Sequence, residues 1–367
     1  METMKITPNL KKAYPIVYTK NSVLIGGFGT VSKYDDPDGA VTQLFKLING
    51  KNTIKAISLA IQKSYPQYNT EDIMELINDL NKEHYIEGLS HIGSKTLDNY
   101  ALKRYHRNIN FFSSYIDLDQ NKYLVEKKIQ NTRIGILGLG GLGSHIVYDL
   151  AGLGFGYIHA VDFDTVDLTN LNRQILYNEN DIGKEKGLLA KKRITDFNSH
   201  VQFNYTRKKI SSSQDLIDIF NDVDLLICVA DRPKYQLAQW INEAIIELNI
   251  PLFCAGLEAH RAMHYTIIPH ITGCIQCWRN ETKNDNPVTE LFLSEKKRKN
   301  LTGDNTAIFP LVSTITGHLC VEILKYVTKI GQLNSAGKLV SVDFDTMQSS
   351  VSEEWLPDPK CTICGGA

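Results

Sequence analysis

The chain has 367 residues and a hydrophobic fraction of 43%, which is enough for a packed core and predicts two domains, or one large domain with an added module. Its formal net charge of -1 at pH 7 excludes a general electrostatic attraction to nucleic acid. No apolar run approaches the roughly 20 residues that a membrane-spanning helix needs, so we expect a cytoplasmic α/β protein with neither a nucleic-acid nor a membrane partner.

Residues 1–92 are predicted to form a small α+β module of the winged-helix type. Glycines at 26 and 27 separate two short strands, and an Asn-Gly pair at 49–50 ends an amphipathic helix. The expected strands cover 22–25 and 30–32 with a closing strand from 85, and the expected helices cover 38–48, a segment that begins after Thr53, and 70–81. DNA binding is the alternative for such a module, but its candidate recognition segment, 71–79, is acidic and would repel phosphate.

Residues 93–128 form the predicted connection between this module and a larger domain over 129–367. The connection carries the segment Arg104-Tyr-His-Arg107, followed by an aromatic-rich stretch from Phe111 to Tyr115. Its basic residues become informative only together with the motifs of the larger domain.

The larger domain opens with a glycine-rich turn between an apolar strand and a helix. The strand Ile134–Leu137 leads into Gly138-Leu-Gly-Gly-Leu-Gly143, and the next strand ends at Asp162. Glycines allow a tight turn and a close approach of phosphate to the backbone at a helix N-terminus. An acidic residue about 20 positions further on is suited to bind a ribose hydroxyl, and Asp162 fits that role. An ordinary tight turn is the alternative for the glycines alone.

Polar and basic residues follow Asp162 closely and distinguish this pattern from a nicotinamide-binding one. They are Asp164, Asn170, Arg173, Gln174 and Lys186. Arg173 can contact two phosphate oxygens at once, and Lys186 can act as a point charge on them. A dinucleotide carries only a pyrophosphate, whereas a nucleoside triphosphate that is being cleaved develops charge on its leaving group. The pattern therefore favours a nucleoside triphosphate, with a solvated surface charge as the alternative for each cation alone.

Asp231 follows an apolar strand predicted over 223–229, and ligands bind at such strand ends in open α/β sheets. The alternative is a purely structural role as the N-cap of a helix over 234–248, with Pro233 in its first turn.

Four of the seven cysteines form two Cys-x-x-Cys pairs. The pairs are Cys274-Ile-Gln-Cys277 and Cys361-Thr-Ile-Cys364, each with an adjacent glycine. Two such pairs are typical of one tetrahedral zinc site, which is structural because four thiolates leave no open coordination position. Redox or disulfide use is the alternative, and it is disfavoured because we expect no signal peptide and because Cys228, Cys254 and Cys320 lie in apolar segments.

Together these motifs resemble the ThiF/MoeB/ubiquitin-activating superfamily of adenylyltransferases, from about Arg104 to the C-terminus. The matching residues are Gly138, Gly140, Gly141, Gly143, Asp162, Asn170, Arg173, Gln174, Lys186 and Asp231. The resemblance implies a Rossmann-like adenylation domain in which Asp162 binds ribose and Asp231 holds Mg²⁺. It implies that Asn170, Arg173 and Lys186 contact the phosphates. It also implies a homodimer in which Arg107 reaches the triphosphate of the neighbouring subunit.

The polar segment 279–305 resembles the crossover loop of this superfamily. Relatives that carry their product as a thioester need an exposed cysteine on that loop, and this segment contains none. We therefore expect chemistry that ends at an acyl-adenylate or continues without a covalent enzyme intermediate. The segment is predicted to be a long loop, for which covering a bound peptide is the alternative use, and it precedes a helix over about 311–329 and a strand over 339–345.

The N-terminal module resembles the PqqD-type peptide-recognition element of ribosomal-peptide biosynthesis, which binds a precursor peptide as an extra strand at a sheet edge. Module and core together resemble the microcin C-type peptide nucleotidyltransferases. That resemblance implies that the C-terminal Asn of a short ribosomal peptide is activated and joined to a nucleotide through a phosphoramidate bond. It also implies that the reaction can proceed through a succinimide intermediate. The resulting hypothesis is a peptide nucleotidyltransferase that uses ATP or CTP with Mg²⁺, and whose catalytic residues are Arg107, Arg173, Lys186 and Asp231.

Two alternatives are carried alongside this hypothesis. One is adenylation of a sulfur-carrier protein that ends in Gly-Gly, which the added N-terminal module disfavours. The other is a non-enzymatic protein that delivers a precursor peptide to a cyclodehydratase, which the intact charged residues disfavour. The segment 181–184 is a candidate contact for the base, and the segment 256–261 lies on the expected substrate side, where it is a candidate contact for the peptide terminus.

Overall fold

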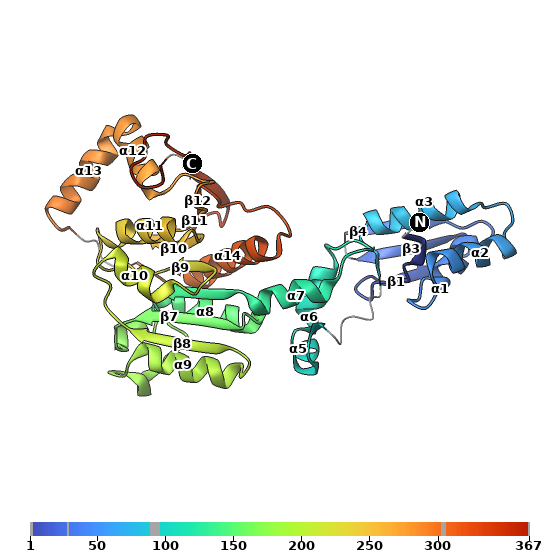
Figure 1. Cartoon of the computed structure of the whole chain (residues 1–367), viewed down its shortest axis with the longest axis horizontal. Helices are drawn as coiled ribbons and strands as arrows, with labels where there is room; N and C mark the ends of the chain where they lie inside the picture. The colour runs from blue at the N-terminus through green and yellow to red at the C-terminus, as the bar shows by residue number, and fades with distance from the viewer. Residues whose placement is uncertain (1–2, 28, 89–95, 302–305, 366–367) are drawn as a thin grey trace. The chain divides into compact units, whose positions relative to one another are not determined.

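The computed structural model of the chain describes residues 3–27, 29–88, 96–301 and 306–365 (Figure 1). The chain divides into two compact units, Met1–Lys128 and Ile129–Ala367.

The first unit contains two small antiparallel sheets and a helical layer. One sheet has the strand order β2 (Ile16–Tyr18), β3 (Ser22–Gly27) and β4 (Thr30–Asp35), and in the other β1 (Pro8–Leu10) pairs with β5 (Ile86–Gly88). The helices that follow β4 are α1 (Ala40–Leu47), α2 (Ile54–Ser64) and α3 (Thr70–Lys82), and the short helix η1 (Thr3–Lys5) precedes β1. The predicted hairpin and helices are confirmed, including the cap at Thr53, whose hydroxyl accepts from the Ala56 amide at 3.1 Å.

Strands β1 and β2 of this unit were not predicted. Each has only three residues, which is too short for an alternation of apolar and polar side chains to be recognised. Apolar side chains from α1, α2 and α3 pack with Val23 and Ile25 of β3 in one core. The identification of this unit as a peptide-recognition module stays a prediction.

The described part of the predicted connection, residues 96–128, is largely helical. It contains α5 (Asn99–Arg104), α6 (His106–Ser113) and the start of α7 (Lys122–Asn131). Leu97, Ala101, Tyr105 and Ile109 form a small buried cluster. Arg107 is exposed on α6.

An eight-stranded sheet forms the centre of the second unit, in the order β13-β12-β11-β10-β9-β6-β7-β8. Its strands are β6 (Arg133–Leu137), β7 (Tyr157–Asp162), β8 (Gln202–Arg207), β9 (Leu225–Cys228), β10 (Leu252–Glu258), β11 (Arg261–Ile267), β12 (Lys338–Asp343) and β13 (Ser349–Glu354). Strands β6 to β10 pair in parallel, and β11 to β13 extend the sheet in antiparallel fashion. The predicted α/β, Rossmann-like fold is confirmed.

Most helices of this unit pack in two groups. The helices are α8 (Gly141–Leu153), α9 (Lys186–Phe197), α10 (Ser213–Phe220), α11 (Leu237–Leu248), α12 (Ile275–Asp285), α13 (Pro287–Arg298) and α14 (Phe309–Thr328), with the short helices η2 (Leu168–Asn170) and η3 (Glu179–Asp181). Helix α8 packs against α9 and α14, whereas α10 packs against α11, which in turn contacts α12. Every residue of β9 is buried, so both of its faces are covered.

The prediction of a loop over 279–305 is wrong. Helices α12 and α13 occupy most of this segment (orange in Figure 1), and residues 302–305 lie outside the described residues. Asn286 caps α13 by accepting from the Thr289 amide at 3.1 Å, and Pro287 stands in its first turn. No residue of α13 is buried, and its apolar residues Val288, Leu291 and Phe292 are exposed. They stand at helical spacing but span little more than one turn, which is too short to indicate a helix from periodicity.

None of the helices in the described ranges has both the length and the apolar character that would let it cross a membrane.

Candidate functional site

The predicted site residues of the second unit lie along the carboxyl edge of the parallel strands, around the point where β6 and β9 are neighbours. From β6 the chain proceeds to β7 and β8 on one side, and from β9 to β10 on the other. The two strand ends are joined by the Val229 amide, which donates to the Leu137 carbonyl at 3.0 Å. Ligands bind at such a reversal of strand order in α/β sheets.

The glycine turn fits here only because two of its residues lack a side chain. Gly138 has a φ of 102°, and a Cβ there would lie 2.9 Å from the backbone nitrogen of Ala230. A Cβ on Gly143 would lie 2.0 Å from the Gly138 carbonyl oxygen. Helix α8 begins at Gly141, and no side chain caps its first amides, because Gly140 is the N-cap residue. The turn therefore leaves helix amides available to an anion.

Asp162 ends β7 and is bound directly to the glycine turn. Its carboxylate accepts hydrogen bonds from the Leu139 amide at 2.6 Å and from the Asp164 amide at 2.8 Å. Burial raises the pKa of Asp162, while these amides and nearby Lys186 oppose the rise. The structure thus brings Asp162 to the turn, and its assignment to a ribose stays a prediction.

Arg173 lies over the start of α8. A Cβ on Gly141 would lie 3.3 Å from Arg173 Nε. The guanidinium donates to the Thr169 carbonyl at 3.1 Å and to Asn172 Oδ1 at 2.7 Å. These two hydrogen bonds orient the guanidinium beside the helix N-terminus, where an anion could contact both the guanidinium and the helix amides.

The two predicted amide side chains are used differently. Asn170 Oδ1 accepts from the Asp167 amide at 3.1 Å and so belongs to the capping box of η2. Gln174 is 4% exposed, and its Oε1 has no hydrogen-bond partner among the described residues. Its Nε2 would lie 3.7 Å from a Cβ on Gly140. Gln174 therefore has unused hydrogen-bonding capacity beside the glycine turn.

Lys186 is the first residue of α9 and is only 4% exposed. Its Nζ lies 3.5 Å from Asp164 Oδ2, which is long for a charge-assisted hydrogen bond. A buried ammonium needs a close anionic partner, and Asp164 is about half exposed, so it meets this need only in part. A phosphate group is a suitable further partner for this ammonium.

Two tyrosines of the site were missed by the sequence reasoning. The hydroxyl of Tyr177 donates to the Leu139 carbonyl at 2.9 Å and lies 3.5 Å from the Lys186 carbonyl, so it joins the glycine turn to α9. Burial raises the pKa of Tyr177 well above its usual value, which keeps it a donor. Tyr205 donates to the Asp162 carbonyl at 3.3 Å. Neither residue belongs to a recognisable motif or spacing, so a single sequence gives no signal that identifies them.

The alternative role of Asp231 as a helix N-cap is wrong. Helix α11 begins at Leu237, and its N-cap residue is Gln236, because the chain forms a turn over 234–236. Asp231 is exposed directly after β9. Its assignment to Mg²⁺ stays a prediction, as does the approach of Arg107 to the triphosphate of a neighbouring subunit.

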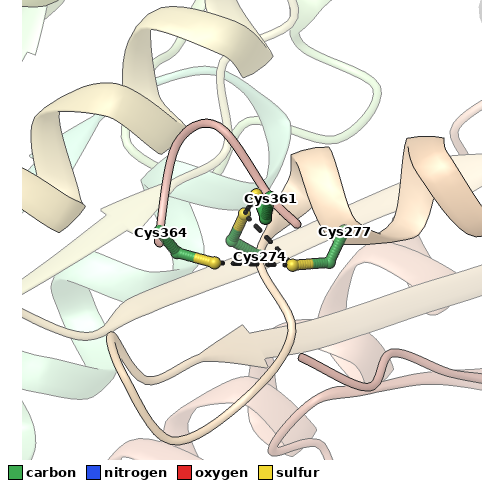
Figure 2. A group of neighbouring side chains, drawn as sticks. All are labelled: Cys274, Cys277, Cys361 and Cys364. Carbon is green, nitrogen blue, oxygen red and sulfur yellow. Dashed lines mark hydrogen bonds between the residues drawn. The ribbon is translucent and has the colours of Figure 1, made fainter. Parts of the chain in front are cut away.

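The four cysteines of the two Cys-x-x-Cys pairs converge on one point (Figure 2). The Sγ atom of Cys274 lies 3.7 Å from those of Cys277 and Cys361, and the Sγ atoms of Cys277 and Cys364 are 3.5 Å apart. A tetrahedron of thiolates about 2.3 Å from zinc has sulfur–sulfur edges of about 3.8 Å, so the arrangement fits that metal. The Asp358 amide donates to Cys277 Sγ at 3.3 Å, as in a site built for thiolates.

The remaining cysteines, Cys228, Cys254 and Cys320, are buried and form no disulfide.

Comparison with known proteins places this geometry in a family. The chain matches the ThiF family over residues 105–363. Among curated proteins, it is 32% identical to a ubiquitin-activating enzyme E1-like protein of Saccharomyces cerevisiae over 44% of this chain and 25% of that protein. It is 30% identical to the sulfur carrier protein ThiS adenylyltransferase of Escherichia coli over 45% of this chain and 65% of that protein. The chain thus spans between a quarter and two thirds of these relatives.

A solved structure resembles the fold of the whole chain. It is E. coli MccB with AMPCPP and MccA, with a TM-score of 0.76 and 23% sequence identity over 98% of this chain and 99% of that chain. This likeness extends over both units, whereas the two curated matches given above each cover less than half of the chain.

We predict that Gly143→Ala abolishes the thermal stabilisation that Mg·ATP gives to the protein. The new Cβ would overlap the Gly138 carbonyl, and overpacking of this kind costs about 1–3 kcal/mol. The matched control is Gly152→Ala in the same helix, where the nearest atom to a Cβ is 3.9 Å away. Thermal unfolding with and without Mg·ATP should show the shift in the wild type and in Gly152→Ala. A normal shift in Gly143→Ala would contradict the role of the turn.

We also predict that the purified protein holds zinc and that Cys364→Ser loses it, since three thiolates bind zinc more weakly than four. Cys320→Ala, which changes a cysteine outside the cluster, should keep the wild-type zinc content. Elemental mass spectrometry after dialysis measures both. A wild-type protein without zinc, or a Cys364→Ser variant with the full amount, would refute the zinc assignment.

Proposed function

The chain belongs to the ThiF family, and from that premise we propose that it is a nucleotidyltransferase that activates the C-terminus of a short ribosomal peptide ending in Asn, with ATP or CTP as the donor. The observation that carries the proposal is the convergence of the glycine turn, Asp162, Arg173 and Lys186 on one edge of the sheet. That edge combines helix amides, a buried ammonium and a carboxylate, which are the groups that a nucleoside triphosphate requires.

The proposed positions of the nucleotide follow from these groups. Asp162 binds the ribose, because its carboxylate stands at the end of the strand next to the glycine turn. Arg173 and Lys186 contact the β- and γ-phosphates, with the Gln174 amide as a further hydrogen-bonding group. Asp231 holds Mg²⁺, which when bound neutralises phosphate charge and orients the α-phosphate.

In the proposed reaction a carboxylate oxygen of the peptide attacks the α-phosphorus. The bond between that phosphorus and the oxygen bridging to the β-phosphorus breaks, and pyrophosphate leaves with the electron pair. Arg173 and Lys186 stabilise the charge that develops on the leaving group. Arg107 of a second copy adds to them, so the active form is a homodimer.

The N-terminal unit is the proposed binding site for the body of the peptide. Strand β4 is at one edge of the sheet β2-β3-β4, and its six residues offer an outer row of backbone groups to an added strand. The resemblance to E. coli MccB, whose solved structure contains MccA and AMPCPP, supports a peptide rather than a carrier protein as the substrate. The relationship to the ThiS adenylyltransferase keeps a Gly-Gly carrier as the second candidate.

A delivery protein without catalysis is the least favoured reading. Such a protein needs no buried ammonium, and Lys186 is held at 4% exposure next to Asp164. Burying this charge is unfavourable unless an anionic ligand uses it.

We predict pyrophosphate release from Mg·ATP or Mg·CTP in the presence of a short peptide ending in Asn, with a nucleotide-sized gain in the mass of the peptide. Lys186→Ala and Asp231→Ala should each lower kcat/KM by roughly 100-fold or more, the order seen when one group that stabilises developing charge is removed. Coupled pyrophosphate detection and mass spectrometry measure the two readouts.

The matched controls are Lys191→Ala, an exposed lysine on the same helix as Lys186, and Asp345→Ala, an exposed aspartate in the turn after β12. Both should retain wild-type rates. Release only with a Gly-Gly carrier would transfer the protein to the sulfur-carrier class, and unchanged transfer in Asp231→Ala would overturn the assigned role of that residue.

A further inference from the structure

A cavity of about 200 Å³ opens beside Asp231, between α11 and one face of the central sheet. Cys228, Cys254 and Tyr265 are in register on β9, β10 and β11, so their side chains share that face. Gly256 lies two residues beyond Cys254 and lines the same cavity. Leu237 and Ile241 of α11 cover it from the other side. The cavity is therefore a slot between sheet and helix at the edge where the proposed reaction takes place.

The slot is partly open: Asp231 and Lys234 on its lining are exposed and Met263 and Leu339 are half-buried, whereas its deeper residues are buried. Asp231 and Lys234, its two charged lining residues, belong to the segment after β9 and are exposed. Ile275, which also lines the slot, is only 5% exposed, and Cys254 is 6% exposed. A group that enters from the reaction site would pass the charged residues first and then reach an uncharged interior.

The interior favours an uncharged group. Apart from the two residues at its opening, the slot is lined by aliphatic side chains, thiols and the Tyr265 phenol. Burial raises the pKa of Tyr265 well above its usual value, so the phenol stays neutral. A carboxylate or ammonium that entered would lose its hydration without gaining a partner of opposite charge inside.

We infer that this slot receives the side chain of the C-terminal residue of the substrate, and that this side chain is uncharged. The inference rests on the proposed function, because it places the terminal carboxylate next to Asp231. An apolar cavity of about 150 Å³ is known to hold a molecule as large as benzene, so this slot has room for a full side chain. A C-terminal glycine would leave it empty, whereas the carboxamide of Asn would enter it.

Gly256 offers a direct way to close the slot. No heavy atom lies within 4 Å of a Cβ built at this position, so a larger side chain projects into open space rather than into the core. Gly256→Leu should therefore fold normally and fill part of the slot. Gly317 of α14 is the matched control, because a Cβ there also meets no atom within 4 Å, and it does not line the slot.

The test measures binding of three fluorescent peptides that differ only in a C-terminal Asn, Asp or Gly, by anisotropy on the full chain without nucleotide. In the wild type and in Gly317→Leu, the Asn peptide should bind at least about tenfold more tightly than the Gly and Asp peptides, the order expected for filling a pocket and for excluding a charge. In Gly256→Leu, the affinity for the Asn peptide should fall to that for the Gly peptide, while the Gly peptide binds as before. Met263→Ala, which enlarges the slot, should shift the preference toward a Phe-ended peptide.

Equal binding of the three peptides by the wild type, or an unchanged Asn preference in both Gly256→Leu and Met263→Ala, would overturn the inference. Nucleotide transfer to all three peptides at one rate would also overturn the inference; it would keep the transfer to a peptide C-terminus and remove the requirement for Asn. Transfer only to a Gly-Gly carrier would refute the proposed substrate, and the inference would fall with it.

Discussion

The close contact between the ends of β6 and β9 is the constraint on which the candidate site depends. Gly138 approaches the backbone of Ala230 so closely that no side chain fits, and Gly143 contacts the Gly138 carbonyl in the same way. This double contact fixes where α8 begins and brings the glycine turn within hydrogen-bonding distance of Asp162. The proposed nucleotide and substrate sites thus share one short edge, because the same strand ends border both.

The cysteine cluster lies against α11, the helix that covers the slot. Asn242 of α11 donates to Cys274 Sγ at 3.4 Å and accepts from the Ile275 amide at 3.0 Å, so the cluster is tied to the helix that covers the slot. The ring of Trp355 lies 4.7 Å from that of Tyr265, which joins the C-terminal segment to the floor of the slot. A metal bound at the cysteine cluster would therefore stabilise the walls of the slot, which is the proposed site of the substrate side chain.

Features that depend on residue type at a fixed spacing can be predicted from the sequence, whereas features that depend on tertiary contacts cannot. The glycine turn and the cysteine pairs are predictable because only glycine tolerates the contact at Gly143, and because four thiolates define a zinc site. Tyr177 is not predictable, since its partner Leu139 is 38 residues away and no motif marks the contact. The slot cannot be predicted either, because its lining residues come from four strands, two helices and the segment after β9. Helix α13 was not predicted because its apolar residues at helical spacing, Val288, Leu291 and Phe292, span little more than one turn.

The most direct measurement is a crystal structure of the full chain with Mg²⁺ and a non-hydrolysable ATP analogue. We expect a triphosphate at the N-terminus of α8, in contact with Arg173 and Lys186, and a ribose on Asp162. A nucleotide bound away from the glycine turn, or with its base where the phosphates are expected, would contradict this expectation.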